Sequence, residues 1–128
     1  MAEPIVFISR HRIVEERRDD LARAYAGAVD LIRATKPATA LFAAYLDQAG
    51  AEVRIVHAFR DAAAMALHFE GSGERSQAAA GLMTPAGFEI YGRAPGPAID
   101  QLRRDAALTH ASVDVLDETL GGFLRAVD

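Results

Sequence analysis

The sequence predicts an α+β domain whose elements follow in the order β-α-β-β-α-β. Three observations support this prediction. Residues 5–13 are a β-rich run that begins apolar and then alternates, as expected of a strand covered on both faces. Residues 15–35 place apolar side chains at three- and four-residue steps, which is typical of an amphipathic helix. Residues 39–47 and 52–59 are two further β-rich runs joined by a short turn, which indicates a hairpin.

The boundaries of these elements have local causes. Pro37 ends the first helix because its ring locks φ and it has no N–H to donate. Gly50 supplies the positive φ that a tight hairpin turn requires. Asp61 is a typical N-cap for a second helix that follows the hairpin. The Gly71-Ser72-Gly73 segment predicts a kink or break in that helix, which resumes over residues 74–82.

Turn-forming residues divide the remainder of the chain. Residues 84–86 are expected to form a loop, and residues 87–93 a fourth strand. Pro95-Gly96-Pro97 then precedes a short helix over residues 98–108 and a short, alternating fifth strand over residues 112–116. The first four strands and two helices have the order of a ferredoxin-like, or split βαβ, domain with an antiparallel sheet. We therefore expect such a domain over residues 1–94. The C-terminal extension, residues 95–128, is expected to pack on this domain or on a dimer partner.

Composition excludes several classes of function. The 128 residues carry 14 Lys and Arg against 18 Asp and Glu, and this net charge of −4 argues against a nucleic-acid groove. The absence of Cys excludes disulfides, thiolate catalysis and Cys-ligated zinc. No run approaches the roughly 18 apolar residues of a membrane span, and no signal peptide is evident. We expect a cytoplasmic protein with no membrane and no nucleic-acid partner.

The predicted sheet has apolar side chains on both faces, although two helices can cover only one of them. Alternation assigns a set of apolar residues to the face that the helices leave open. An exposed apolar face of this size favours a partner, and we expect a second copy of the chain to cover it, giving a homodimer. The residues assigned to the open face are Val6, Ile8, Phe42, Leu46, Val56, Phe88 and Ile90.

Several segments together resemble a known group of proteins. They are residues 7–12 of the first strand, the hairpin over residues 45–59, and the helix segment over residues 61–68 that ends at His68. Over about residues 4–94, the chain resembles the antibiotic-biosynthesis monooxygenase superfamily. The resemblance implies a homodimer whose two sheets meet face to face in a dimeric α/β barrel, with a small apolar pocket between sheet and helices. Some members oxidise quinols or polycyclic aromatics with O₂ and no cofactor, and others open heme.

This chain departs from the better-known catalytic patterns of that superfamily. The aromatic oxidases and the heme-degrading members rely on Asn and Trp near the pocket, and this sequence contains neither residue. An Asn or Trp mechanism is therefore not carried over, and heme degradation loses its support. His68, at the corresponding helix position, is the polar residue that the resemblance nominates as a pocket acid or base.

Histidine and tyrosine side chains supply the candidate site. His11 and His57 are expected on the helix side of the sheet, and His68 on the helix that packs there. We expect His68 to transfer a proton, because an imidazole can deprotonate an acidic phenol or carbon acid. His57 and Tyr91 are expected to assist His68 in catalysis. No metal and no cofactor are expected. Further residues that we expect to line the ligand pocket are His11, Tyr25, Tyr45, Phe59 and Glu89.

Two functions from different classes follow from these residues. The first is a cofactor-independent monooxygenase that acts on a small aromatic or quinol substrate held between sheet and helices. The alternative is a non-catalytic homodimer that binds a small ligand or has a structural role. The missing Asn and Trp favour the alternative, and each histidine can equally be a satisfied core residue. A metal site formed by the three histidines is disfavoured because their spacing forms no local ligand motif.

Overall fold

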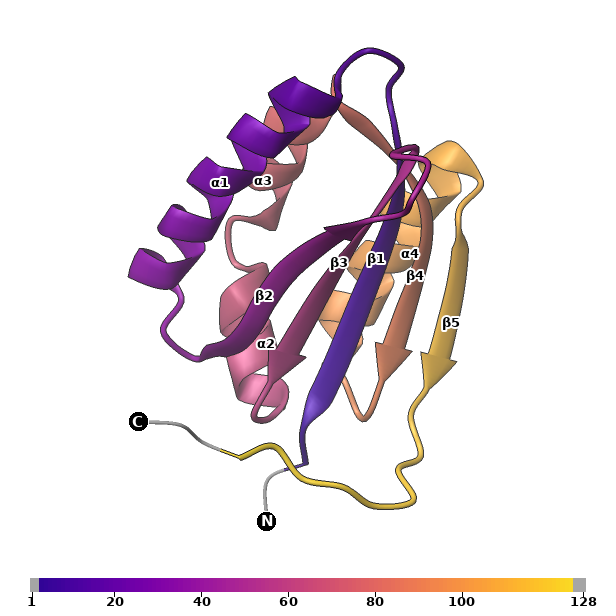
Figure 1. Ribbon diagram of the computed structural model, residues 1–128. Coiled ribbons are helices and arrows are strands. Elements are labelled where there is room, and N and C mark those ends of the chain that lie inside the picture. The colour runs from indigo at the N-terminus through magenta and orange to yellow at the C-terminus, as the bar shows by residue number, and fades with distance from the viewer. Residues whose placement is uncertain (1–2, 126–128) are drawn as a thin grey trace.

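The chain has a ferredoxin-like α+β fold with one extra helix and one extra strand at its C-terminal end (Figure 1). The computed structural model describes residues 3–125. The elements, in chain order, are β1 (Ile5–Ile13), α1 (Arg18–Thr35), β2 (Thr39–Leu46), β3 (Glu52–Phe59), α2 (Ala62–Phe69), α3 (Ser72–Ala79), β4 (Met83–Tyr91), α4 (Gly96–Thr109) and β5 (Ser112–Leu116).

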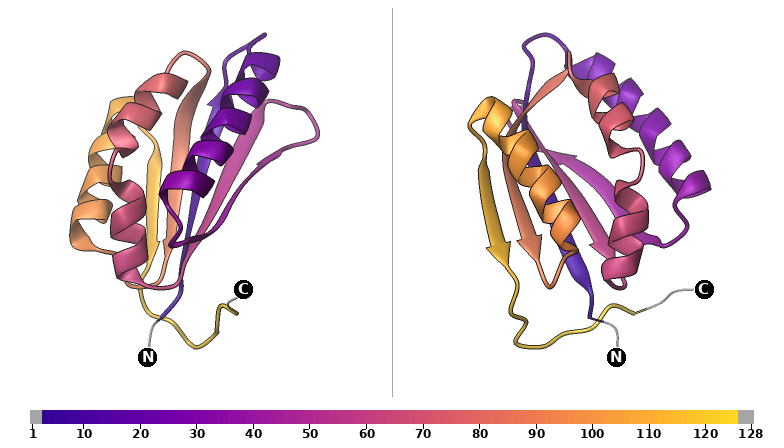
Figure 2. Two further views of the ribbon diagram at one scale, coloured as in Figure 1. Left: turned by 90° about the vertical axis from the view of Figure 1, so that its left-hand side faces the viewer. Right: turned by 180° about the vertical axis from the view of Figure 1, so that it is seen from behind.

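The five strands form one open sheet in the order β2-β3-β1-β4-β5. The first four strands pair antiparallel, as predicted, whereas β5 adds to the edge parallel to β4. The sheet is therefore mixed, because α4 carries the chain back across the sheet before β5 begins, as a parallel connection requires. The helices pack on one face of the sheet and leave the other face open (Figure 2).

Two apolar clusters hold the helices to this face. The larger joins β1, β3 and β4 to α2 and α4, with Phe59, Met65 and Ile90 fully buried at its centre. The smaller lies under α1, where Leu21 packs on Val53 of β3. Only two residues of the long helix α1 and none of α3 are buried, against three each in α2 and α4, so α1 and α3 are held less tightly than the other two helices. α4 contributes to the larger cluster, while the division of the chain at residue 94 stays a prediction.

The register of the sheet corrects the assignment of several apolar residues to the open face. Residues directly opposite in paired strands share a face. Phe7 lies opposite Ile90, and His57 lies opposite Phe42, so these side chains all face the helices. The same pairing moves Leu46 and Phe88 to the helix side. The open face instead carries Val6, Ile8, Leu41, Ala43, Tyr45, Val56, Ala58, Tyr91 and Leu116, and toward one end Arg10, Glu52, Arg54 and Glu89.

The expected loop over residues 84–86 is part of β4. The pairing of β1 with β4 shifts by one residue between Arg10 and His11, so that His11 lies opposite Pro85. Proline has no N–H for a ladder hydrogen bond, and a bulge is one of the few places where a sheet accepts it. The carbonyl of Pro85 accepts a hydrogen bond from Thr109 Oγ1 at 3.0 Å, which ties the bulge to the end of α4.

The predicted break in the second helix is present. α2 ends at Phe69, and Gly71 adopts a φ of 78° before α3 begins, a conformation that suits glycine. Asp61 caps α2 as expected, since its side chain accepts a hydrogen bond from the Ala64 N–H at 2.9 Å. α1 begins at Arg18, three residues later than residue 15, because the chain turns there with Glu16 at a φ of 67°.

No helix among residues 3–125 is long and apolar enough to cross a membrane. After β5, the chain runs without regular structure past the end of the sheet where β1 begins (Figures 1 and 2). Leu120 and Phe123 in this segment are largely exposed.

Candidate functional site

Three buried histidines lie on the helix side of the sheet, as the alternation of β1 and β3 predicts. His11 comes from β1, His57 from β3 and His68 from α2, with exposed fractions of 8%, 6% and 4%. The rings of His57 and His68 are in contact, with their centroids 5.1 Å apart and their planes nearly perpendicular. Phe7, Phe42, Phe59 and Phe69 surround this pair, so it lies in a largely apolar environment.

One hydrogen bond sets the tautomer of His57. Its Nδ1 lies 3.1 Å from the carbonyl oxygen of Phe7 on the neighbouring strand. A carbonyl can only accept, so Nδ1 carries the proton and Nε2 is left with a lone pair. The ring also stacks on Phe7, with a centroid distance of 4.7 Å. His57 is thus held rigidly in contact with the ring of His68.

His68 pairs with a hydroxyl group. Its Nδ1 lies 2.8 Å from Oγ1 of Thr39, at the start of β2. Its backbone carbonyl accepts a hydrogen bond from Arg75 of α3, and this contact links α2 to α3 across the break between them. Among residues 3–125, the Thr39 hydroxyl is the hydrogen-bond partner found for the imidazole, and Thr39 also lines a cleft at the surface.

Burial lowers the pKa of all three histidines. Loss of hydration lowers the pKa of His11 to about 4 and that of His57 to about 4. The pKa of His68 falls to about 3, chiefly through burial and then through the positive charges that His57, Arg75 and Lys36 can carry. At neutral pH the three rings are therefore uncharged. Each neutral ring has one nitrogen with a lone pair, which can accept a hydrogen bond or a proton.

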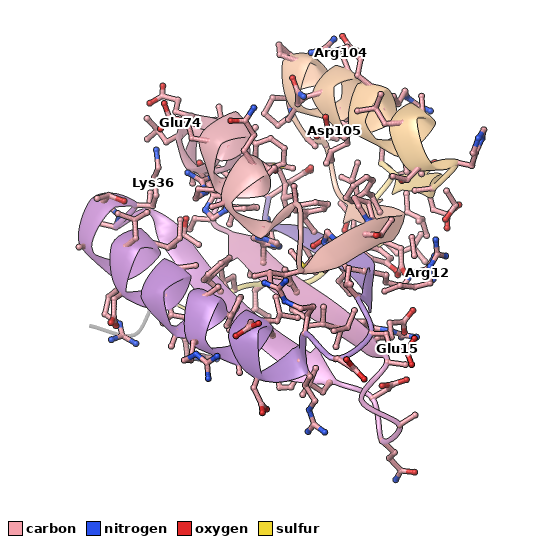
Figure 3. The ribbon with its side chains drawn as sticks, turned by 90° about the horizontal axis from the view of Figure 1, so that it is seen from above. Arg12, Glu15, Lys36, Glu74, Arg104 and Asp105 are labelled. Carbon is pink, nitrogen blue, oxygen red and sulfur yellow. The ribbon has the colours of Figure 1, made fainter. Side chains whose placement is uncertain are left out.

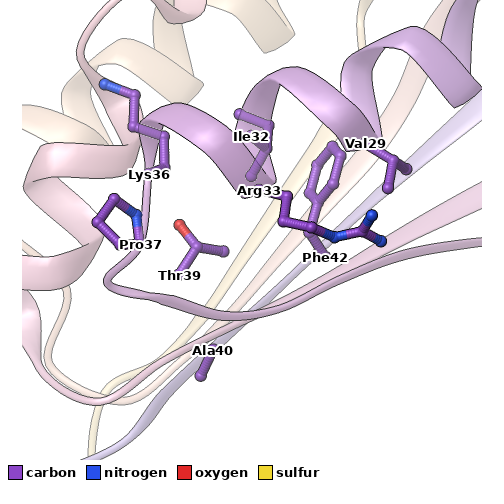
Figure 4. A pocket seen from close by; sticks show the side chains of 8 residues that line it. All are labelled: Val29, Ile32, Arg33, Lys36, Pro37, Thr39, Ala40 and Phe42. Atoms are coloured by element: carbon purple, nitrogen blue, oxygen red, sulfur yellow. The ribbon is translucent and has the colours of Figure 1, made fainter.

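A cleft of about 390 Å³ opens between the C-terminal half of α1 and the beginning of β2 (Figure 4). Thr39 and Phe42 connect this cleft to the histidines: the Thr39 hydroxyl reaches His68, and the Phe42 ring lies 5.3 Å from that of His57. The lining residues are Val29, Ile32, Arg33, Lys36, Pro37, Thr39, Ala40 and Phe42.

A bulge in β2 creates this arrangement. The pairing with β3 shifts between Thr39, opposite Phe59, and Leu41, opposite Ala58. Ala40 is the extra residue, and Thr39 therefore faces the helices together with Phe42, three positions away. Sequence alternation places residues 39 and 42 on opposite faces and gives no sign of the bulge, so the meeting of Thr39 with Phe42 and His68 was missed. Lys36 and Arg33 were missed because exposed basic residues near a helix end carry no signal of their own.

A second hollow of about 220 Å³ lies under the N-terminal half of α1 and is lined almost entirely by apolar side chains. Tyr25 borders it and stacks on Phe42, with ring centroids 5.3 Å apart. The Tyr25 hydroxyl is buried without a hydrogen-bond partner, and burial raises its pKa. Phe42 lines the cleft and Tyr25 lines the second hollow, and their rings are in contact.

The sheet separates three of the expected pocket residues from the histidines. Tyr91 lies opposite Val6, and Glu89 opposite Ile8, so both point to the open face. There the Tyr91 hydroxyl donates to Glu89 at 2.6 Å. Tyr45 is also on the open face and is 61% exposed. We expected these residues to line the space around the histidines, but within one chain they lie on the far side of the sheet.

The remaining expected residues lie on the helix side at different depths. Phe59 is fully buried, and its ring lies 5.1 Å from that of His68. His11 lies farther along β1, edge-on to Phe88, and its Nδ1 is buried without a hydrogen-bond partner. No three His, Asp or Glu side chains between residues 3 and 125 gather closely enough to hold a metal ion.

Comparison with known proteins identifies the fold. No protein-family model and no curated protein matches the sequence. Among solved structures, MupZ from Pseudomonas fluorescens matches with a TM-score of 0.64 and 17% identity, over 94% of this chain and 95% of that one. SnoaB, a cofactor-independent oxygenase from Streptomyces nogalater, matches with a TM-score of 0.60 and 14% identity, over 75% and 99%. The chain has the fold of the antibiotic-biosynthesis monooxygenase-like proteins.

A third match adds detail on how much of the chain is shared. A candidate antibiotic biosynthesis monooxygenase from Caulobacter crescentus matches with a TM-score of 0.62 and 10% identity, over 70% of this chain and 88% of that one. The match to MupZ covers so much of the chain that it includes most of α4 and β5. At these identities the likeness concerns the fold, and the chemistry has to be argued from the site itself.

Proposed function

We propose that this protein is a cofactor-independent monooxygenase that acts on a small aromatic or quinol substrate in the cleft between α1 and β2. One observation carries the proposal: His68, neutral and buried, contacts the hydroxyl of Thr39 at the wall of that cleft. In this proposal the Thr39 hydroxyl relays a proton from the substrate to His68, and His57 positions the imidazole ring of His68. Tyr91, on the open face, is left out of the proposed mechanism.

The proposed reaction begins with deprotonation. The imidazole accepts a proton from an acidic O–H or C–H bond, and the resulting electron-rich anion reacts directly with O₂. For an anthrone, the CH₂ carbon is oxidised to a carbonyl. One atom of O₂ remains on that carbon, and the other leaves as water with the two hydrogens. No external reductant is needed, because the substrate supplies the electrons.

The low pKa of His68 shapes this step. An isolated imidazolium is disfavoured in an apolar site. Transfer of a proton from a bound phenol creates an anion and a cation together, so the net charge of the pocket does not change, and their attraction is strong at low dielectric. The base is therefore expected to work on bound substrate, with little proton uptake from water.

Oxygen uptake tests the proposed activity. With a panel of quinols and anthrones, we expect uptake above the rate of autoxidation for at least one member, without added flavin, metal or nicotinamide. Labelled O₂ should leave one atom of ¹⁸O on the new carbonyl of an anthrone, or on the new hydroxyl group of the hydroxyquinone that a quinol gives together with water. Autoxidation in the presence of heat-denatured protein is the control, and the same rate with native and denatured protein for the whole panel would contradict the proposal.

The alternative is a non-catalytic protein that binds a small ligand. The aromatic enclosure of His68 favours it, because a ring only 4% exposed can be a satisfied core residue. The same panel separates the two functions. Binding without oxygen uptake supports the alternative, whereas uptake with product formation supports the monooxygenase.

The proposed assembly is a homodimer in which the open faces of two sheets meet. Val6, Ile8 and Val56 form an apolar strip at the centre of this face, and no helix covers it. Beside the strip, Arg10 lies 3.2 Å from Glu89 and 3.9 Å from Glu52. A second copy would bury the apolar strip and shield these ion pairs from water.

Replacing Ile8 with Glu is expected to separate the dimer without unfolding the chain. The substitution places two like charges at a symmetric apolar contact, while Ile8 contributes nothing to the core on the helix side. Light scattering should give the mass of two chains for the native protein and of one chain for Ile8→Glu. Leu108→Glu, at an 83% exposed position of α4, is the matched control and should stay dimeric. A native protein with the mass of one chain would refute the dimer.

A further inference from the structure

We infer that the cleft between α1 and β2 selects a compact aromatic anion, whose acidic group lies against Lys36 and Arg33 while its reacting group faces Thr39. This inference deepens the proposed function by naming the charge of the substrate. It comes from the residues that line the cleft, in which two basic side chains and one hydroxyl stand over an apolar wall.

The charges at the cleft have one sign. Lys36 and Arg33 are the charged residues that line it, and no carboxylate does. Lys36 forms none of the ion pairs found among residues 3–125, and the nearest carboxylate oxygen to Arg33 belongs to Asp30, at 3.8 Å between two well-exposed side chains. A pair of this kind contributes little, so both cations can meet a ligand.

Lys36 also has a structural contact. Its Nζ donates to the carbonyl of Leu67 at the end of α2, at 2.8 Å, and it follows directly on the last residue of α1. The two helix ends carry about half a negative charge each. The two side chains that line the cleft bring two full positive charges, which exceed the partial charges of the helix ends, and Asp30 beside Arg33 lies outside the lining. An ammonium group has three N–H bonds, and the contact with Leu67 uses one of them.

A short turn fixes the distance between the basic group and the hydroxyl. The N–H of Thr39 donates to the carbonyl of Lys36 at 3.0 Å, and Pro37 restricts the backbone between them. A ligand held by its acidic group at Lys36 therefore presents a neighbouring part of its ring to Thr39 and, behind it, to His68. Figure 3 shows Lys36 just after the C-terminal end of α1 and Glu15 before its N-terminal end, so the two lie at opposite ends of the helix.

The remaining lining suits an aromatic ring of limited size. Val29, Ile32 and Pro37 are apolar, and Phe42 offers a ring for stacking, which is visible beside Arg33 in Figure 4. A volume of about 390 Å³ is near the lower end for small-molecule sites, which favours a compact ring system over a large polycyclic ligand.

A matched pair of ligands tests the inference. The probes are 1,4-dihydroxy-2-naphthoate and 1,4-dihydroxynaphthalene, which share the quinol ring and differ in the carboxylate. Binding is measured by calorimetry without oxygen, so that no turnover contributes. We expect the acid to bind at least tenfold more tightly than the neutral quinol, and this preference to shrink as salt is raised.

Substitutions assign the preference to the cleft. Lys36→Gln should weaken binding of the acid about tenfold and leave the neutral quinol nearly unchanged. Lys36→Arg should retain most of the preference because it keeps the charge and can still donate to Leu67. Arg104→Gln alters an exposed residue of α4; it is the control and should change neither affinity.

Equal binding of the two probes, binding of neither, or an unchanged preference in Lys36→Gln would overturn the inference. These outcomes are independent of the proposed monooxygenase activity. A preference for the acid that is lost in Lys36→Gln supports the inference even if oxygen uptake is absent, and oxygen uptake with a neutral quinol supports the activity even if the preference is absent.

Discussion

Lowering the pH from 7 to 5 is expected to destabilise the folded chain by roughly 6 kcal/mol, because three buried histidines resist protonation. Their pKa values in the folded state are about 4 for His11, about 4 for His57 and about 3 for His68. In the unfolded chain each has the ordinary value of about 6.5. At a pH between the folded and the unfolded pKa of these histidines, the unfolded state binds more protons than the folded state.

The direction of the effect follows from this difference in proton binding. Stability rises with pH wherever the unfolded state holds more protons. The contribution of the three histidines to stability is therefore complete above about pH 6.5 and is lost as the pH falls toward 4. At pH 5 the loss is about 2 kcal/mol per histidine, and small domains have only about 5–15 kcal/mol in total. We therefore expect the midpoint of urea unfolding, followed by circular dichroism, to fall steeply between pH 6.5 and 5.

Two variants show whether the buried histidines are the cause. His11→Leu removes a ring whose Nδ1 has no hydrogen-bond partner, so it should fold and should reduce the pH dependence by about one third. His110→Asn alters an exposed residue that ends α4 with a φ of 57°, a conformation that Asn tolerates. It should leave the pH dependence unchanged. A urea midpoint that stays constant from pH 7 to 5 in the native protein would refute the explanation.

Loss of the His68 imidazole is expected to reduce turnover at least 100-fold, since general base catalysis typically contributes a factor of 10² to 10⁴. His68→Ala also opens a cavity among Phe42, Phe59 and Phe69, so part of its effect will be on stability. Turnover of any substrate from the oxygen-uptake panel should be compared at pH 7 and at a temperature where the variant is folded by circular dichroism.

Thr39→Val separates chemistry from stability. Valine has nearly the shape of threonine but lacks the hydroxyl that contacts His68 and faces the cleft. We expect kcat to fall at least tenfold, whereas the loss of one hydrogen bond to a buried ring should lower the free energy of unfolding by only about 1–3 kcal/mol. Thr35→Val is the matched control, because the Thr35 hydroxyl bonds only to Leu31 within α1. Full activity in both His68→Ala and Thr39→Val would remove this pair of residues from the mechanism.

The order of the elements follows from local sequence. Residues 39–47 and 52–59 form the predicted hairpin because both runs have β-forming side chains and Gly50 supplies the turn, with a φ of 71°. Asp61 and Gly71 begin and end α2 through contacts within a few residues. Such signals depend on the neighbouring residues and can be read without the rest of the chain.

The faces of the sheet depend on pairing between distant residues. Alternation states which side chains of one strand share a face, but not which face of the next strand they join. The pairing of Phe7 with Ile90 decides this for β4, and the pairing of Phe42 with His57 decides it for β2. For that reason the open face was correctly expected for Val6 and Ile8 and wrongly for Phe42 and Ile90.

The sequence by itself determined the fold class and the expectation that the three histidines lie on the helix side of the sheet, since the order of elements and the alternation within one strand are local patterns. Only the tertiary structure decided which groups meet them. The bulge at Ala40 turns Thr39 toward His68, and the turn before it brings Lys36 to the same cleft. A bulge changes the alternation of a strand by one residue, and its position depends on how the paired strands fit. The cleft and its charge therefore arise from packing between α1, α2 and β2.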